Sequence, residues 1–160
     1  MGRLPGRNNR PGSSSPRMIK PLKNFDKDWR KYAACRGESP SSFFFDDTSP
    51  NHQARRLCVS CPVRIDCLEY ATEHEKDWGI WAGVTARVRL SLRRLMHKTK
   101  TKSVLELLAT KPNAVLNMYP ATSRVYRRSA DKPSPISTHD MFQSLIEAAK
   151  IRNNSNYSKD

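Results

Sequence analysis

The chain has 160 residues, a net charge of +14 at pH 7 and a hydrophobic content of 37%. This length allows one domain of ordinary size, but the low hydrophobic content and the 11 prolines indicate that much of the chain lies outside a core. No apolar stretch is long enough for a membrane span, and residues 1–17 lack the apolar segment of a secretory signal. The composition argues against a membrane or secreted protein, so we expect a cytoplasmic one with reduced cysteines.

The positive charge is concentrated in two segments. Residues 1–31 contain nine Lys or Arg against two acidic residues, and residues 85–128 contain eleven against one. Residues 32–84 are mildly acidic, with five basic and eight acidic residues. Solubility alone hardly explains one acid among eleven bases, so residues 85–128 predict contact with a polyanion, most simply nucleic acid.

The N-terminal part predicts a tail and one short helix. Residues 1–25 are rich in Arg, Gly, Pro and Ser, which is typical of a disordered basic tail. From Asp26 to Cys35, aromatic and alanine side chains recur with helical spacing, and Gly37 stops the pattern. We therefore expect a helix with Cys35 at its C-terminal end and Trp29 in the core or on a partner-facing surface.

Two prolines mark the starts of the next helices. Pro50 follows a capping serine and predicts a helix to about residue 58, with Arg55 and Arg56 exposed. Pro62 repeats this arrangement and predicts a helix to about residue 75. The apolar stripe of that second helix consists of Ile65, Leu68 and Ala71.

The four cysteines follow the pattern C-x22-C-x2-C-x5-C, at Cys35, Cys58, Cys61 and Cys67. A C-x2-C pair presents two thiols from one turn, and a helical turn can return the last cysteine to the same point. Without export, four converging thiols are more typical of a metal site than of a disulfide framework. Structural zinc and an iron–sulfur cluster both remain open, and the uneven spacing and the Cys61-Pro62 dipeptide favour iron–sulfur.

Aromatic residues gather in two loops. Phe43, Phe44 and Phe45 cannot all face one side of a helix or a strand, so at least one is expected at the surface or over the metal site. Trp78 and Trp81 lie in a turn that contains two glycines. Large aromatic residues in such loops often anchor protein interfaces, although packing against the metal site explains them as well.

A basic amphipathic helix follows this turn. Thr85 can cap it, and the helix is expected to run to about Lys98. Its apolar stripe consists of Val84, Val88, Leu92 and Leu95. The basic residues that we expect to contact DNA are Arg87, Arg89, Arg93, Arg94, Lys98, Lys100 and Lys102. Such a helix suits a DNA groove or phosphate backbone; a membrane surface is the competing use, but the stripe lacks Trp and Phe.

The C-terminal third is harder to interpret. One or two helical turns are expected over residues 104–109, and the prolines of residues 112–137 indicate a linker. Thr138 can cap a last helix that ends near residue 152, and residues 153–160 are expected to be disordered. The apolar face of that helix consists of Phe142, Leu145, Ile146 and Ala149. We assign no function to it.

Together these motifs resemble the WhiB-like proteins of actinobacteria and their phages. The resemblance covers about residues 26–97. It rests on the four-cysteine pattern with Cys61-Pro62-Val63, on the turn Gly79-Ile80-Trp81-Ala82-Gly83 with the basic helix behind it, and on Asp28-Trp29-Arg30, Ala34-Cys35-Arg36 and Phe43-Phe44-Phe45. Ala82 departs from the family pattern, which usually has glycine there, and its methyl group can alter the turn or the fit to a partner.

The resemblance implies a [4Fe-4S] cluster held by Cys35, Cys58, Cys61 and Cys67. It also implies a transcription factor that docks on the principal sigma factor of RNA polymerase, and we expect a monomer apart from sigma. The expected sigma contacts are Trp29, Phe43, Phe44, Trp78 and Trp81. Basic residues behind the turn would reach promoter DNA, and the cluster would respond to oxygen or nitric oxide.

The expected fold is all-α, a small bundle of short helices around a cysteine-ligated iron–sulfur cluster with disordered basic tails. The expected segments are a tail at 1–25, a cluster domain at 26–84, a basic DNA-binding segment at 85–111, and a linker with a final helix at 112–160. Two other functions remain open: a zinc-stabilised DNA-binding protein, and a thiol–disulfide reductase that uses Cys58 and Cys61 in the cluster-free form. No thioredoxin-like alternation of strands and helices surrounds that pair, so we do not expect an enzyme.

Overall fold

The structure is a computed structural model that describes residues 28–44, 52–120 and 136–157. Within these ranges it contains six α-helices, two short 3₁₀ helices and no β-strand, apart from an isolated antiparallel bridge between Trp81 and Val84. The all-α prediction is therefore confirmed for the described residues, and the expected N-terminal tail lies outside them. None of the described helices is long and apolar enough to cross a membrane.

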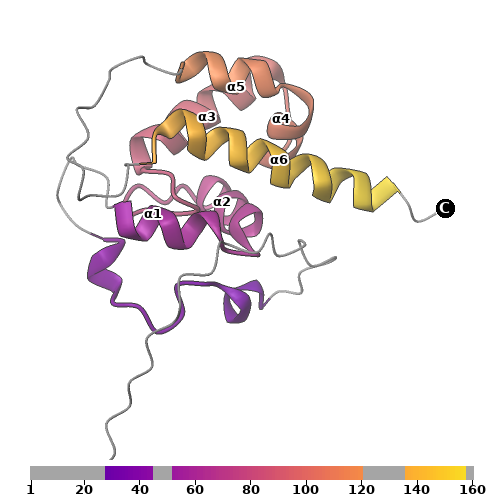
Figure 1. The fold of residues 1–160 in the computed structure, drawn as a ribbon. Helices are drawn as coiled ribbons and strands as arrows, with labels where there is room; N and C mark the ends of the chain where they lie inside the picture. The colour runs from indigo at the N-terminus through magenta and orange to yellow at the C-terminus, as the bar shows by residue number, and fades with distance from the viewer. Residues whose placement is uncertain (1–27, 45–51, 121–135, 158–160) are drawn as a thin grey trace, which may run out of the picture.

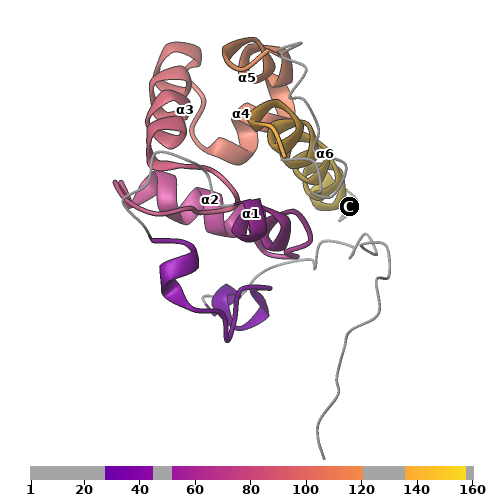
Figure 2. The same ribbon diagram turned by 60° about the vertical axis from the view of Figure 1, so that its left-hand side comes forward.

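The helices form two groups on either side of a central pair (Figure 1). In chain order the elements are η1 at Trp29–Tyr32, η2 at Pro40–Ser42, α1 at His52–Val59, α2 at Arg64–Glu73, α3 at Ala86–Thr99, α4 at Val104–Thr110, α5 at Pro112–Met118 and α6 at Thr138–Tyr157. In Figures 1 and 2, α1 and α2 lie centrally, with the 3₁₀ helices on one side and α4 and α5 on the other. The long helix α6 packs against α2, α4 and α5.

Most predicted helices correspond to observed ones. The predictions for residues 50–58, 62–75, 85–98 and 104–109 correspond to α1, α2, α3 and α4, with ends shifted by a few residues. Burial of the predicted apolar stripe of α2 confirms its orientation.

Three predicted segments differ from the structure. The predicted helix up to Cys35 is reduced to a single 3₁₀ turn, because the backbone at Ala33 is extended with ψ at 134°. The predicted linker begins with α5, which Pro112 opens in the first turn, where its missing N–H costs nothing. The last helix runs on to Tyr157 instead of ending near residue 152.

The larger of two buried apolar clusters lies among α2 to α6, and we call it the helical core. Its members are Ile65, Leu68, Ala82, Val84, Val88, Leu92, Val104, Leu107, Leu108, Val115, Met141, Phe142, Leu145, Ile146 and Ala149. The predicted apolar face of α6 lies entirely inside it. Because its members run from Ile65 to Ala149, this core spans the three segments expected from residue 26 onward.

The second buried cluster is much smaller. It consists of Phe43, Ala54, Cys58 and Ile80, with Leu57 packed against it. A large apolar side chain contributes roughly 1.5–3 kcal/mol when fully buried, whereas ordering the backbone costs about 1–2 kcal/mol per residue. Four residues therefore cannot order the chain around them unaided. We call the described residues 28–61 the cysteine side and α2 to α6 the helical side.

The two sides are also joined by polar contacts. Arg55 of α1 is 4% exposed, and its Nη1 donates to the carbonyl of Ile136 at 3.0 Å. The prediction of an exposed Arg55 is therefore wrong, because the segment that enters α6 covers it. Within the helical side, Asp66 of α2 forms an ion pair with Arg152 of α6 at 2.8 Å, largely shielded from solvent.

Candidate metal centre and its surroundings

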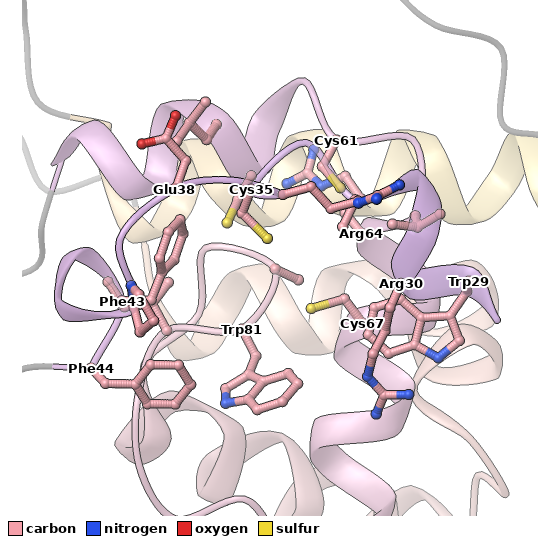
Figure 3. A pocket seen from close by; sticks show the side chains of 18 residues that line it. Trp29, Arg30, Cys35, Glu38, Phe43, Phe44, Cys61, Arg64, Cys67 and Trp81 are labelled. Carbon is pink, nitrogen blue, oxygen red and sulfur yellow. The ribbon is translucent and has the colours of Figure 1, made fainter.

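The four cysteines lie around one cavity. Cys35 follows η1, Cys58 lies in the last turn of α1, Cys61 lies between α1 and α2, and Cys67 lies in the first turn of α2. All four are free thiols, and all four line a cavity of about 340 Å³. Figure 3 shows Cys35, Cys61 and Cys67 on the wall of this cavity. The structure thus brings the four expected ligands together from separate segments.

Backbone hydrogen bonds produce this convergence. The amide of Cys61 donates to the carbonyl of Cys58 at 3.2 Å, which closes the turn between α1 and α2. The amide of Cys67 donates to the carbonyl of Val63 at 2.9 Å and starts α2. The amide of Ala34 donates to Cys61 Sγ at 3.4 Å, so the segment after η1 is drawn to the other cysteines.

Burial raises the pKa of three of the four thiols. The pKa of Cys58 is raised to about 12 and that of Cys67 is also raised, first by desolvation and then by the neighbouring cysteines. Desolvation is also the main cause of the raised pKa of Cys35, followed by the charge of Cys61. A reactive thiol of a reductase needs a lowered pKa, so the environment of Cys58 disfavours that use. A metal that binds here must displace the thiol protons.

Three buried arginines surround the cysteines. Arg55, Arg64 and Arg89 are at most 5% exposed, and Arg is rarely buried without a partner. Desolvation lowers the pKa of all three, to about 10 for Arg64 and for Arg89, and ionised cysteines nearby act in the opposite direction. The cavity therefore lies in a positively charged part of the interior.

Arg64 shows most directly what the cavity is suited to hold. It lines the cavity (Figure 3), and its hydrogen-bond partners are all neutral: the carbonyl of Val59, the hydroxyl of Ser144 and the sulfur of Met141. Its Nε has no partner, and no described carboxylate pairs with it. A buried cation without an anion is costly. A metal group with four thiolate ligands carries negative charge, so the residues present fit such a group.

A row of aromatic rings, which we call the aromatic row, includes three side chains that line the same cavity, Trp29, Phe44 and Trp81. It consists of Trp78, Phe44, Trp81, Tyr70 and Trp29, with successive ring centroids 5.7, 6.2, 5.8 and 5.8 Å apart. The guanidinium of Arg30 lies 4.6 Å from the centroid of Trp29 and 4.2 Å from that of Tyr70. The other end is open to solvent, because Trp78 is 57% exposed and Phe44 is 36% exposed.

Four of the five expected partner contacts belong to the aromatic row, and the fifth does not. Phe43 is buried, packs with Ala54 and Ile80, and accepts a hydrogen bond at its carbonyl from the Ile80 amide at 2.8 Å. Its assignment as a partner contact is therefore corrected, because the side chain belongs to the small core beneath the row. Phe45 lies outside the described residues.

The turn between α2 and α3 has a strained backbone. Gly79 and Gly83 have positive φ angles, and a Cβ at these positions would collide with Phe44 and with Met141, respectively. Ala82 has a φ of +54° and is buried. An L-residue pays about 1–2 kcal/mol for this left-handed conformation. The methyl group at the family's usual glycine position is thus accommodated in the core at the expense of backbone strain.

Arg89 holds this turn and does not face solvent. Its guanidinium donates to four backbone carbonyls at 2.6–3.2 Å, those of Lys76, Trp78, Gly79 and Val84. The expected DNA contact at Arg89 is therefore corrected. The helical period explains the difference, because Arg89 lies three residues before the fully buried Leu92 and shares its face of α3.

The other expected DNA contacts lie at or near the surface. Five of them are exposed: Arg87, Arg94, Lys98, Lys100 and Lys102. Arg93 is partly buried and forms an ion pair with Glu75. Arg87, Arg94 and Lys98 are spaced by seven and four residues, so they lie along one line of α3. This line provides a positively charged surface.

Two residues near the cysteines were not expected from the sequence: Arg64, which lines the cavity, and Tyr70, which lies between Trp29 and Trp81 in the aromatic row. Each lies three residues from Cys67 along α2, one on either side. Residues three apart on a helix are neighbours. That spacing from a predicted ligand is the signal that identifies both.

Comparison with known proteins identifies the family. The family model described as Transcription factor WhiB matches residues 29–92, which hold all four cysteines. The transcriptional regulator WhiB2 of Mycobacterium tuberculosis is 38% identical over 66 residues, which cover 41% of this chain and 74% of the relative. WhiB of Streptomyces coelicolor is 36% identical over 66 residues, covering 41% and 76%. WhiB1 of M. tuberculosis is 35% identical over 81 residues, covering 48% and 96%.

The chain therefore belongs to the WhiB family of transcription factors. These are regulators and not enzymes, which sets aside the thiol–disulfide reductase. The matched range ends within α3, so α4, α5 and α6 lie beyond it.

Proposed function

We propose that this chain is a cytoplasmic transcriptional regulator that holds a [4Fe-4S] cluster on its four cysteines. It docks on the principal sigma factor of RNA polymerase through the aromatic row and contacts promoter DNA through α3. The observation that carries the proposal is the convergence of four free thiols on one cavity beside the buried Arg64, which has no carboxylate partner among the described residues. When bound, the cluster supplies a cross-link between chain segments and a group sensitive to oxygen or nitric oxide.

The geometry supports a cluster over a single zinc ion. The sulfur ligands of zinc lie about 2.3 Å from the metal and therefore close to one another. Here the four cysteines line a cavity of about 340 Å³, which has room for a group of several iron atoms.

Metal and sulfide content of the full chain, purified without oxygen, tests the cofactor. We expect iron and acid-labile sulfide in a brown sample with broad visible absorption. Cys61→Ser removes one ligand and should abolish this absorption, whereas Ser60→Ala at the preceding position should keep it. A colourless wild-type protein with stoichiometric zinc would contradict the proposal.

The exposed end of the aromatic row supports sigma docking. Large aromatic side chains that are exposed together are typical interface anchors, and truncation of one costs about 2 kcal/mol or more at a hot spot. We expect Trp78→Ala to weaken sigma binding and to leave the visible absorption intact. Leu90→Ala is the matched control, since Leu90 is an exposed apolar residue of α3 outside the row. Equal affinity of wild type and Trp78→Ala for the sigma factor would show that the exposed end of the aromatic row is not part of the interface.

The line of cations on α3 supports a contact with DNA phosphates. Neutralising Arg94 and Lys98 with glutamine should weaken binding of the sigma-bound complex to all DNA sequences, and should reduce the salt dependence by about one unit per residue. Arg93→Gln is the control, because Arg93 is already paired with Glu75 and its loss should matter less. An unchanged salt dependence in the double variant would exclude a phosphate contact by this line.

A further inference from the structure

Two of the three buried arginines take their partners from beyond the WhiB-matched range. The Nη1 of Arg55 donates to the carbonyl of Ile136 at 3.0 Å. The Nη1 of Arg64 donates to Ser144 Oγ at 2.5 Å, and its Nη2 lies 3.0 Å from Met141 Sδ. Arg89, the third, takes its partners from the turn before α3. The entry to α6 and its first turns thus provide hydrogen-bond partners for Arg55 and for Arg64, which lines the cavity.

Packing places this part of α6 directly behind the cysteines. Met141 is 1% exposed and occupies the space over Gly83, where an added Cβ would collide with it and would lie 3.5 Å from Cys58 Cβ. Ser144 follows Met141 by three residues and therefore lies on the same face of the helix. Farther along, the ion pair between Arg152 and Asp66 fixes α6 to α2 without any contact to Arg64.

Resting on the proposed cluster, we propose that residues 136–144 form part of the metal centre itself. They hold the guanidinium groups of Arg55 and Arg64 beside the thiolate ligands, so that the C-terminal helix sets the electrostatic environment of the bound cluster. Met141 and Ser144 are positioning residues, since they act through Arg64 and do not touch the ligands' sulfur atoms as donors.

The expected consequence concerns the reduction potential. Uptake of one electron, from dithionite through a mediator, adds one negative charge to the cluster and its four thiolates. A nearby cation stabilises that product, and in a low-dielectric interior the interaction is weakly screened. Net charge and hydrogen bonding around a cluster set its potential. Loss or displacement of the Arg64 cation should therefore make the potential more negative.

Two variants of the full chain separate positioning from packing. Ser144→Ala removes the hydroxyl that accepts from Arg64 and scarcely changes side-chain volume. Arg152→Gln breaks the ion pair of α6 with Asp66 and leaves the partners of Arg64 in place. The midpoint potential is measured by dithionite titration followed in the visible spectrum, together with the rate of absorption loss in air and the iron and sulfide content.

We expect a more negative midpoint potential and a several-fold faster loss in air for Ser144→Ala, with a larger shift for Arg64→Gln. Met141→Leu, which keeps the packing and removes the sulfur, should shift the potential in the same direction. Arg152→Gln should reduce the stability of the fold and keep the wild-type potential. Failure of Ser144→Ala to retain iron, while Arg152→Gln retains it, also supports the proposal.

Two results would overturn it. The first is a wild-type midpoint potential in both Ser144→Ala and Met141→Leu, or a shift in Arg152→Gln equal to that in Ser144→Ala. Either outcome would show that α6 contributes only packing, and neither would count against the proposed cluster. A wild-type chain without iron and sulfide would overturn the proposed function and this inference together, so the two failures are distinguishable.

Discussion

The cysteine side and the helical side are stabilised in different ways. Fifteen buried apolar residues form the helical core, whereas four form the small core beneath the aromatic row. At roughly 1.5–3 kcal/mol for each large buried side chain, the first cluster can offset much of the cost of ordering its helices, and the second cannot. The dependence on a metal should therefore be confined to one side of the molecule.

The two sides meet at α2, a helix of the helical side that also carries one of the four cysteines. Cys67 faces the cavity, while Leu68, one residue farther, is fully buried in the helical core. The cysteine side is thus anchored to a helix that is already well packed. A metal would then need to hold only η1, η2 and α1 against a preformed surface.

Metal removal should have the largest effect and should divide the molecule. In chelator-treated protein or Cys58→Ser, we expect amide hydrogen exchange to become fast throughout η1, η2 and α1. Protection should persist in α4 and in the second half of α6, because the fully buried Leu107 and Leu145 pack without the metal. Mass spectrometry of exchanged peptides measures both. Equal loss of protection in α4 would show that the helical side also needs the metal.

Truncation of a large side chain in the helical core should destabilise the helical side. Phe142 is fully buried and stacks on Tyr119 at 5.6 Å between ring centroids. Phe142→Ala should lower the free energy of unfolding by about 3–5 kcal/mol, measured by denaturant titration of the metal-loaded protein. Gln143→Ala, at the exposed neighbouring position, should change it by about 0.5 kcal/mol or less. A loss below about 1 kcal/mol for Phe142→Ala would mean that this core contributes less than its burial indicates.

The turn where the sides meet offers a matched pair of substitutions. Gly83→Ala adds left-handed strain of about 1–2 kcal/mol and overpacking against Met141 of about 1–3 kcal/mol, so it should clearly destabilise the protein. Ala82→Gly removes similar strain but loses a buried methyl group worth about 0.8 kcal/mol, so a gain below about 1 kcal/mol is expected. Denaturant titration of both variants measures the difference. Destabilisation by Ala82→Gly would show that methyl packing outweighs the strain.

A smaller effect of pH should be confined to the cysteine side. Desolvation, followed by the charges of Arg55 and Arg56, lowers the pKa of His52 from 6.5. The folded state therefore binds fewer protons than the unfolded state, so stability is full above about pH 6.5 and falls as pH drops below it. His52→Gln should flatten this dependence between pH 7 and pH 6, measured by denaturant titration at several pH values. The same slope in both proteins would assign it to other groups.

The sequence predicted what depends on local periodicity. Helices α1 to α4, the buried face of α6 and the cysteine pattern follow from capping residues and apolar spacing. What it could not predict depends on segments far apart in the chain. Arg55 is buried only because the entry to α6 covers it, and Phe43 is buried because Ile80 pairs with its carbonyl.

Two further differences have local causes that were interpreted wrongly. Proline at residue 112 indicates a linker or the first turn of a helix equally well, and the structure uses it to open α5. A basic residue on a basic helix is most simply exposed, yet Arg89 lies on the apolar face, where four backbone carbonyls replace solvent. The position of Arg89, three residues before the buried Leu92, indicates from the sequence that it lies on the buried face of α3.

The aromatic row gives the molecule a built-in optical reporter. The chain has three tryptophans, and all three belong to the row. Their fluorescence emission therefore follows events in the aromatic row beside the cavity, while far-ultraviolet circular dichroism is dominated by the longer helices opposite. Recorded together during one unfolding experiment, the two signals would reveal whether the halves of the protein separate in sequence or melt as one, without any attached dye.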